Sequence, residues 1–147
     1  DRFTPLAKPL GTDIIQFPTG PAVGRLQEGK PWPEGGLLFR GYRLAKDGTP
    51  TLLYRHGKTD ITDTLSPKDD GFRRRMEFSA GEGKLWVRLA LANEFFTSER
   101  GVWIGANKLT LIAPTARVRT INGKVELIAP IDLKTNDNTV LEVQLSW

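Results

Sequence analysis

Lys84-Leu85-Trp86-Val87-Arg88-Leu89-Ala90-Leu91 indicates a β-fold, because apolar and polar residues alternate along it. Leu85, Val87, Leu89 and Leu91 are expected on one side of an extended chain, and Lys84, Trp86, Arg88 and Ala90 on the other. Such alternation is typical of a β-strand that buries one face. No window of the sequence shows the 3.6-residue periodicity of an amphipathic helix.

The same period of two recurs along most of the chain. We expect strands at residues 12–17, 37–45, 50–56, 59–64, 72–79, 84–92, 101–105, 108–113, 115–121, 124–129 and 139–147. Residues 93–100 have room for one helical turn at most. Short strands separated by frequent turn signals predict a single all-β domain over residues 1–147, an antiparallel β-sandwich or flattened barrel of about ten short strands.

Asn122-Gly123 gives the clearest hairpin signal, because both residues tolerate the positive φ of a type I′ turn. A two-residue loop sets Arg119 opposite Glu126 and Val118 opposite Leu127. Opposite charges then face each other and apolar residues face each other, so the register is self-consistent.

Ala80-Gly81-Glu82-Gly83 predicts a second hairpin, in which Ser79 lies opposite Lys84. A third turn, Lys46-Asp47-Gly48, joins strands 37–45 and 50–56. The register of this third hairpin stays open, because both faces of its strands mix apolar and charged residues.

The first 36 residues differ in composition, with six of the ten prolines before residue 34. We expect them to form a Pro/Gly-rich, loop-rich arm that lies across one face of the domain. We predict that nine apolar side chains are buried in the core: Met76, Phe78, Leu85, Val87, Leu89, Val118, Leu127, Val143 and Leu145.

Composition excludes several kinds of chemistry. The chain of 147 residues has no cysteine and one histidine, which excludes disulfides, thiolate metal sites and multi-histidine metal centres. We therefore expect no transition metal and no cofactor. Twenty-one Lys and Arg residues against 17 Asp and Glu give a net charge of +4, with the two signs interspersed.

Several segments carry a resemblance to a known family. They are Gly20-Pro21-Ala22-Val23, Trp32-Pro33, Phe39-Arg40-Gly41-Tyr42-Arg43-Leu44, Gly48-Thr49-Pro50-Thr51-Leu52-Leu53-Tyr54, Ile61-Thr62-Asp63-Thr64 and Arg73-Arg74-Arg75. From about residue 15 to the C-terminus, the chain resembles a β-rich domain of large exported planctomycete-type proteins. Those proteins carry c-type haem domains, often with a sugar-dehydrogenase-like propeller.

The resemblance implies a non-haem module, since the chain lacks Cys-x-x-Cys-His. It also implies an exported setting, in the periplasm or cell envelope, with haem-carrying or propeller domains as neighbours. It provides no active-site residues to transfer. The chain begins at Asp1 without a basic-then-apolar leader, so we expect a processed form or an excised domain.

Trp86 is the centre of the predicted binding surface. In the second hairpin it lies outward, with Glu77 opposite, Arg88 two residues on, and Arg75 opposite Arg88. A flat aromatic ring among charged hydrogen-bonding groups is suited to stacking on a sugar ring. The alternative is that the arm or the second sheet covers Trp86 while Glu77 bridges the two arginines.

Three further candidates have structural readings as well. Arg74 lies on the inward row and needs a carboxylate partner, for which Asp60 or Asp63 is available. The Asp60–Asp70 region carries four aspartates, which either hold Ca²⁺ or lie on solvated turns. His56 has no metal partner in the sequence and is expected at a surface or strand edge.

Two functions remain open at this point. The first is a non-catalytic, carbohydrate-binding accessory module that uses Trp86, Arg88, Glu77 and Arg75, with Trp103 extending the aromatic platform. The second is a structural spacer or docking domain that positions neighbouring haem or propeller domains and binds no small ligand. Nothing selects a catalytic pair among the carboxylates, and we predict neither enzymatic activity, nor nucleic-acid binding, nor membrane insertion.

Overall fold

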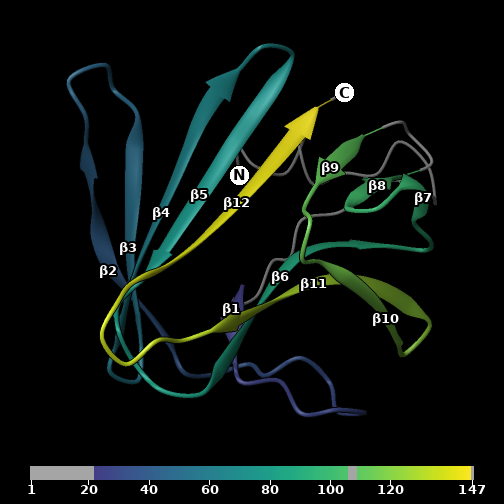
Figure 1. Cartoon of the computed structure of the whole chain (residues 1–147), viewed down its shortest axis with the longest axis horizontal. Coiled ribbons are helices and arrows are strands. Elements are labelled where there is room, and N and C mark those ends of the chain that lie inside the picture. Colours follow the sequence, from purple (N-terminus) through teal and green to yellow (C-terminus); the bar gives the residue numbers. More distant parts are fainter. Residues whose placement is uncertain (1–21, 106–108, 147) are drawn as a thin grey trace.

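The chain forms a sandwich of two antiparallel β-sheets of unequal size (Figure 1). The computed structural model describes residues 22–105 and 109–146. Within these ranges there is no helix, so the predicted all-β class is confirmed, and the sandwich holds rather than the barrel. The predicted strand at 12–17 lies outside the described residues.

The described residues form twelve strands. They are β1 (Val23–Gly24), β2 (Leu37–Leu44), β3 (Pro50–His56), β4 (Thr59–Lys68), β5 (Gly71–Phe78), β6 (Lys84–Ala92), β7 (Phe96–Glu99), β8 (Val102–Ile104), β9 (Thr110–Ile112), β10 (Arg117–Ile121), β11 (Lys124–Asp132) and β12 (Thr139–Ser146). The small sheet has the order β1-β6-β11-β10, and the large sheet has the order β2-β3-β4-β5-β12-β9-β8-β7. Residues 96–99, where a helical turn was the most we expected, instead form the edge strand β7.

The hairpin at Asn122-Gly123 is confirmed in every predicted pair. Arg119 lies opposite Glu126, and Val118 lies opposite Leu127. Asn122 and Gly123 both have positive φ, at 50° and 75°, as the turn requires.

The predicted hairpin at 80–83 is wrong. Strand β5 pairs with β4 and β12, whereas β6 pairs with β1 and β11, so the loop between them crosses from the large sheet to the small one. The Gly81 N–H donates to the Lys134 carbonyl at 2.8 Å, and the Leu133 N–H donates to the Gly83 carbonyl at 3.0 Å. The outgoing crossing therefore runs beside the return crossing from β11 to β12.

A bulge resolves the open register of the β2–β3 hairpin. Phe39 pairs with Tyr54 and Gly41 pairs with Leu53, so Arg40 is the extra residue, and Gly41 adopts a φ of +113°. The bulge shifts the alternation by one residue, which places Tyr42 on the same face as Phe39. Phe39, Tyr42 and Leu44 thus gather on one face, and Arg43 lies on the other.

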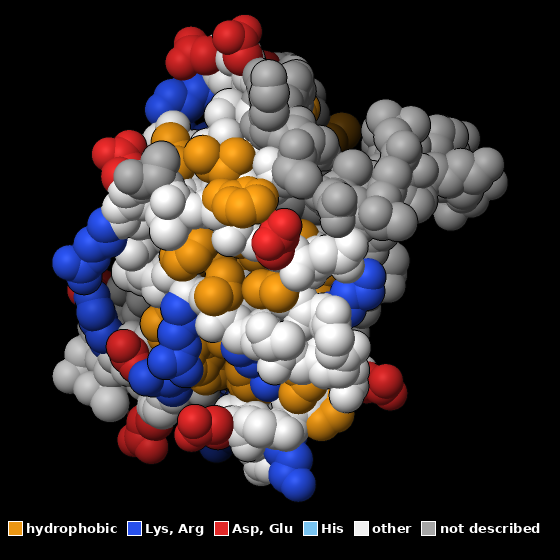
Figure 2. All heavy atoms as spheres, turned by 90° about the vertical axis from the view of Figure 1, so that its right-hand side faces the viewer, with side chains coloured by type: hydrophobic (Ala, Val, Ile, Leu, Met, Phe, Trp, Pro, Cys, Tyr) orange, Lys and Arg blue, Asp and Glu red, His pale blue; other side chains and the backbone are white. Residues whose placement is uncertain are grey.

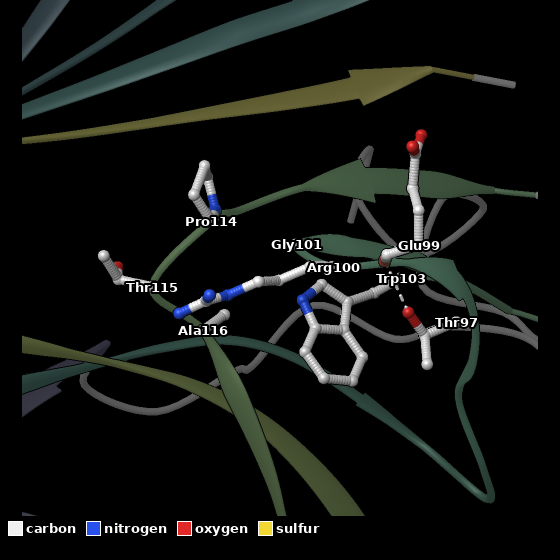
Figure 3. A pocket seen from close by; sticks show the side chains of 8 residues that line it. All are labelled: Thr97, Glu99, Arg100, Gly101, Trp103, Pro114, Thr115 and Ala116. Carbon is white, nitrogen blue, oxygen red and sulfur yellow. Dashed lines mark hydrogen bonds between the residues drawn. The ribbon is translucent and has the colours of Figure 1, made fainter.

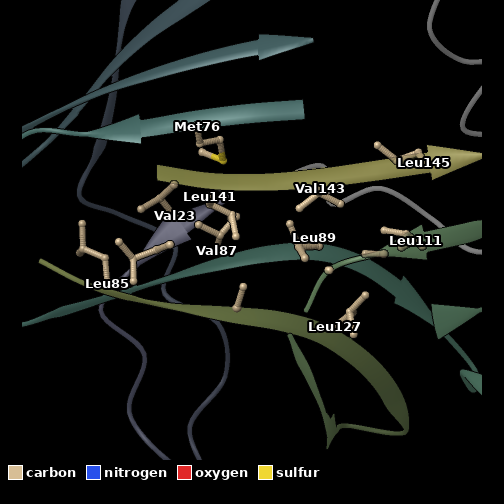
Figure 4. Close-up of a cluster of buried hydrophobic side chains, with 14 of the residues drawn as sticks. Val23, Met76, Leu85, Val87, Leu89, Leu111, Leu127, Leu141, Val143 and Leu145 are labelled. Carbon is tan, nitrogen blue, oxygen red and sulfur yellow. The ribbon is translucent and has the colours of Figure 1, made fainter. Parts of the chain in front are cut away.

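The core lies between the sheets (Figure 4). Of the predicted core residues, Met76, Phe78, Leu85, Val87, Leu89, Leu127, Val143 and Leu145 are buried. The predicted burial of Val118 is wrong, since 42% of its surface is exposed. It faces the same side as Leu127, but β10 is the outermost strand of the small sheet and leaves it open to solvent.

Replacing Leu89 with alanine should lower the free energy of unfolding by about 2–5 kcal/mol, because the side chain is 1% exposed and its loss leaves a cavity. Chemical denaturation provides the measurement. Val118→Ala is the matched control, for which we expect a change within about 0.5 kcal/mol. Equal losses for the two variants would contradict the core described here.

Candidate functional site

The residues of the predicted Trp86 surface do not come together. Arg75 and Glu77 lie on β5 of the large sheet, while Trp86 and Arg88 lie on β6 of the small sheet. Trp103 lies on β8, which belongs to the large sheet. The prediction depended on the 80–83 hairpin, and it is overturned together with that hairpin.

The predicted pairing of Arg75 with Arg88 is therefore wrong. Arg75 lies opposite Thr64 on one side and Glu142 on the other. Its guanidinium is 2.9 Å from Glu77 Oε1, and the Asn138 side-chain amide donates to Glu77 Oε2 at 2.7 Å. The hydrogen bonds from Asn138 and Arg75 lower the pKa of the Glu77 carboxyl. This group is a neutralised, exposed cluster on the outer face of the large sheet.

Trp86 is half-buried on the outer face of the small sheet, with two cations close to its ring. The Arg117 guanidinium lies 4.7 Å from the ring centroid, and Lys84 Nζ lies 5.5 Å from it. Cations at these distances interact with the ring's π-electrons. A sugar that stacked on Trp86 would compete with them for the ring.

Arg88 belongs to a covered ion-pair cluster next to Trp86. Arg88 Nη1 donates to Glu126 Oε2 at 2.9 Å, and Arg119 Nε donates to the other oxygen of the same carboxylate. Trp32, from the segment between β1 and β2, stacks on the Arg88 guanidinium at 5.1 Å. Arg119 also donates to the Lys30 carbonyl at 2.7 Å, so this segment fastens onto the outer face of the small sheet.

Glu126→Gln should lower the free energy of unfolding by about 3–5 kcal/mol. The carboxylate is 3% exposed and neutralises two guanidinium groups, so its loss leaves two largely buried cations without a counter-charge. Glu142→Gln is the control, because that side chain is 52% exposed and 3.7 Å from Arg75; we expect a change below about 1 kcal/mol. Urea unfolding of both variants tests this, and a small loss for Glu126→Gln would contradict the structural role of the cluster.

The aspartates on β4 have arginine partners. Arg74 makes two hydrogen bonds to Asp63, at 3.0 and 2.8 Å, which confirms the carboxylate partner expected for Arg74. Asp60 instead pairs with Arg55 at 2.8 Å, and this bond lowers the pKa of the Asp60 carboxyl. Over residues 22–105 and 109–146, no three His, Asp or Glu side chains converge as a metal site.

His56 lies at the end of β3 and is half-buried. A Cβ placed on Gly36 would come within 2.8 Å of its Nε2, so the ring packs closely against the chain entering β2. Burial, reinforced by the nearby Arg25, lowers the pKa of the imidazole. His56 therefore fills a packing position at the base of the large sheet.

Trp103 lines an open groove that sequence analysis did not delimit (Figure 3). The groove has a volume of about 560 Å³ and lies where the chain crosses from β9 to β10. Its lining comprises Thr97, Glu99, Arg100, Gly101, Trp103, Pro114, Thr115 and Ala116. Hydrophobic side chains gather on this face of the molecule beside Lys and Arg side chains (Figure 2).

A second feature is an apolar part of the large sheet that the small sheet does not cover. Two rows of side chains run across β2, β3, β4 and β5 on one face of this sheet. One row consists of Phe39, Tyr54, Ile61 and Phe78, and the other consists of Tyr42, Leu52, Asp63 and Met76. Burial falls steadily along both rows. Ile61 and Met76 are 1% exposed, whereas Phe39 is 59% and Tyr42 is 64% exposed.

We call this surface the uncovered face and define it as Phe39, Tyr42, Leu44, Leu52 and Leu65. Leu44 and Leu65 are 63% and 45% exposed, and Leu52 is half-buried. Figure 1 shows the tips of the β2–β3 and β4–β5 hairpins projecting away from the small sheet. Sequence analysis missed this surface, because the β2 bulge hides its apolar row from a strict period of two.

Comparison of the chain with protein-family models, with curated proteins and with solved structures gives no match. The resemblance to exported planctomycete-type proteins therefore stays a prediction. In the part of the chain that the structure describes, no helix is long and apolar enough to cross a lipid bilayer.

Proposed function

We propose that this domain is a non-catalytic docking module that binds a neighbouring polypeptide through its uncovered face. The supporting observation is the fall in burial along continuous inward rows, from Met76 at 1% exposed to Tyr42 at 64%. Contiguous apolar surface of this kind is typical of protein–protein contact sites. A flat patch without a deep cavity favours a polypeptide over a small ligand.

The chemistry of the face defines its partner. Phe39 packs edge-on against Tyr54 at 5.5 Å between ring centroids, so the patch includes aromatic side chains of the type enriched at interface centres. The complementary partner is a polypeptide surface that is apolar at its centre.

The partner lies on the face of the sheet rather than beside its edge. Strand β2 is the outermost strand of the large sheet, but the bulge at Phe39–Gly41 interrupts its regular hydrogen-bonding edge. Bulges and edge arginines both oppose the addition of another strand. Side-chain packing on Phe39, Tyr42 and Leu44 is therefore the favoured mode.

The setting we propose is the one that the family resemblance implies. The module would be exported to the periplasm or cell envelope and would position neighbouring haem or propeller domains. A main part of that resemblance is the segment Phe39-Arg40-Gly41-Tyr42-Arg43-Leu44. The same segment forms most of strand β2, which contributes Phe39, Tyr42 and Leu44 to the uncovered face. Carbohydrate binding at Trp86 is less well supported, because Arg117 and Lys84 lie over its ring.

Photo-crosslinking in the natural host tests the docking function. A crosslinking amino acid at Tyr42 should join the domain to one apolar polypeptide segment, identified by mass spectrometry. Leu44→Glu should reduce the yield, because it puts a charge into the apolar surface. Val140, 44% exposed on the opposite face of the large sheet, is the control position and should give no such product.

Three results would overturn the proposal. One is the same set of products from positions 42 and 140. Another is crosslinking confined to residues 1–21 of the same chain, which would make the face an intramolecular contact. The third is crosslinking confined to a second copy of the chain, which would make the face a homodimer interface.

A further inference from the structure

We propose that the Trp103 groove binds an acidic sugar, with the ring of a hexuronate unit against Trp103 and its carboxylate on Arg100. This site is separate from the docking function. The groove belongs to the β7–β9 end of the large sheet, and the uncovered face belongs to the β2–β4 end. Failure of one proposal therefore leaves the other standing.

The walls of the groove are held by close backbone contacts. Arg100-Gly101 forms the turn between β7 and β8, and Gly101 has a φ of +82°. A Cβ at Gly101 would lie 2.9 Å from Pro114 Cα, and the Ala113 N–H donates to the Gly101 carbonyl at 2.8 Å. The turn thus packs directly against the β9–β10 crossing, which gives the groove two fixed sides.

Trp103 provides the apolar surface of the groove. It pairs with Leu111 across β8 and β9, and it packs against the edge of the main core. Its indole N–H is buried and has no acceptor among the described residues. Buried donors without partners are uncommon and point to a missing acceptor.

The charges around Trp103 favour an anion. Arg100 is exposed and makes no ion pair within the described part of the chain. Figure 3 shows its side chain extending toward Thr115 and Ala116, while the Glu99 carboxylate points away from them. The Thr97 hydroxyl donates to the Glu99 carbonyl at 2.7 Å, which leaves its oxygen able to accept from a ligand hydroxyl.

These groups match one class of ligand. An aromatic ring stacks on the C–H face of a pyranose, an arginine binds a carboxylate by charge-assisted hydrogen bonds, and threonine hydroxyls bind sugar hydroxyls. The groove volume of about 560 Å³ lies within the usual range for small-molecule sites. Arg100 occupies an exposed two-residue turn, so it can change rotamer on binding without repacking of the core.

NMR titration provides the test, because the four tryptophan indole N–H groups give separate signals. With a tetramer of galacturonate, we expect the Trp103 signal to shift selectively. A neutral tetrasaccharide should bind at least about tenfold more weakly, since it lacks the charge-assisted contact. Arg100→Gln should weaken binding of the acidic tetramer by a similar factor.

Arg43→Gln is the matched control, an exposed arginine on β2, and should bind the acidic tetramer as the unmodified chain does. Trp103→Phe keeps an aromatic ring but removes the N–H, and it should also weaken binding. Absence of any shift at millimolar tetramer overturns the proposal, as does equal affinity for both sugars or unchanged binding by Arg100→Gln. If inorganic sulfate shifts the Trp103 signal with equal affinity, the site is a simple anion site and the sugar assignment fails.

Discussion

The two sheets differ in size, and this difference determines both where the core forms and which apolar surface stays exposed. The inward rows of β6 and β11 cover β5 and β12 with Leu85, Val87 and Leu127, and this contact forms the core. The inward rows of the large sheet continue beyond that cover to β2. The apolar face of the large sheet therefore extends beyond the small sheet, and the part that the small sheet does not cover stays exposed.

The same sandwich explains why two polar clusters differ in character. Glu126 is sealed on the outer face of the small sheet by Arg88, Arg119 and the Trp32 segment, so its ion pairs are protected from solvent. Glu77 lies on the open outer face of the large sheet, where its hydrogen bonds to Arg75 and Asn138 remain exposed. The first cluster fastens the segment between β1 and β2 to the sheet, whereas the second is a solvated surface feature.

Local alternation predicted which side chains face inward, but it could not identify the partner strands. Phe78 and Leu85 point into the core whether residues 80–83 form a hairpin or a crossing between sheets, so the burial prediction held when the pairing prediction failed. The Arg119–Glu126 pair was predictable, since a two-residue turn fixes its register. The stacking of Trp32 on Arg88 was not, because 56 residues of chain separate the two positions and no turn relates them.

The most direct measurement is hydroxyl-radical footprinting of the purified 147-residue chain. The account predicts rapid oxidation of Phe39 and Tyr42, together with slow oxidation of Phe78 and Met76 at the far ends of the same rows. That result would show an apolar face that the chain itself leaves open. Protection of Phe39 and Tyr42 to the level of Phe78 would show that the chain covers this face by itself, and would contradict the docking surface.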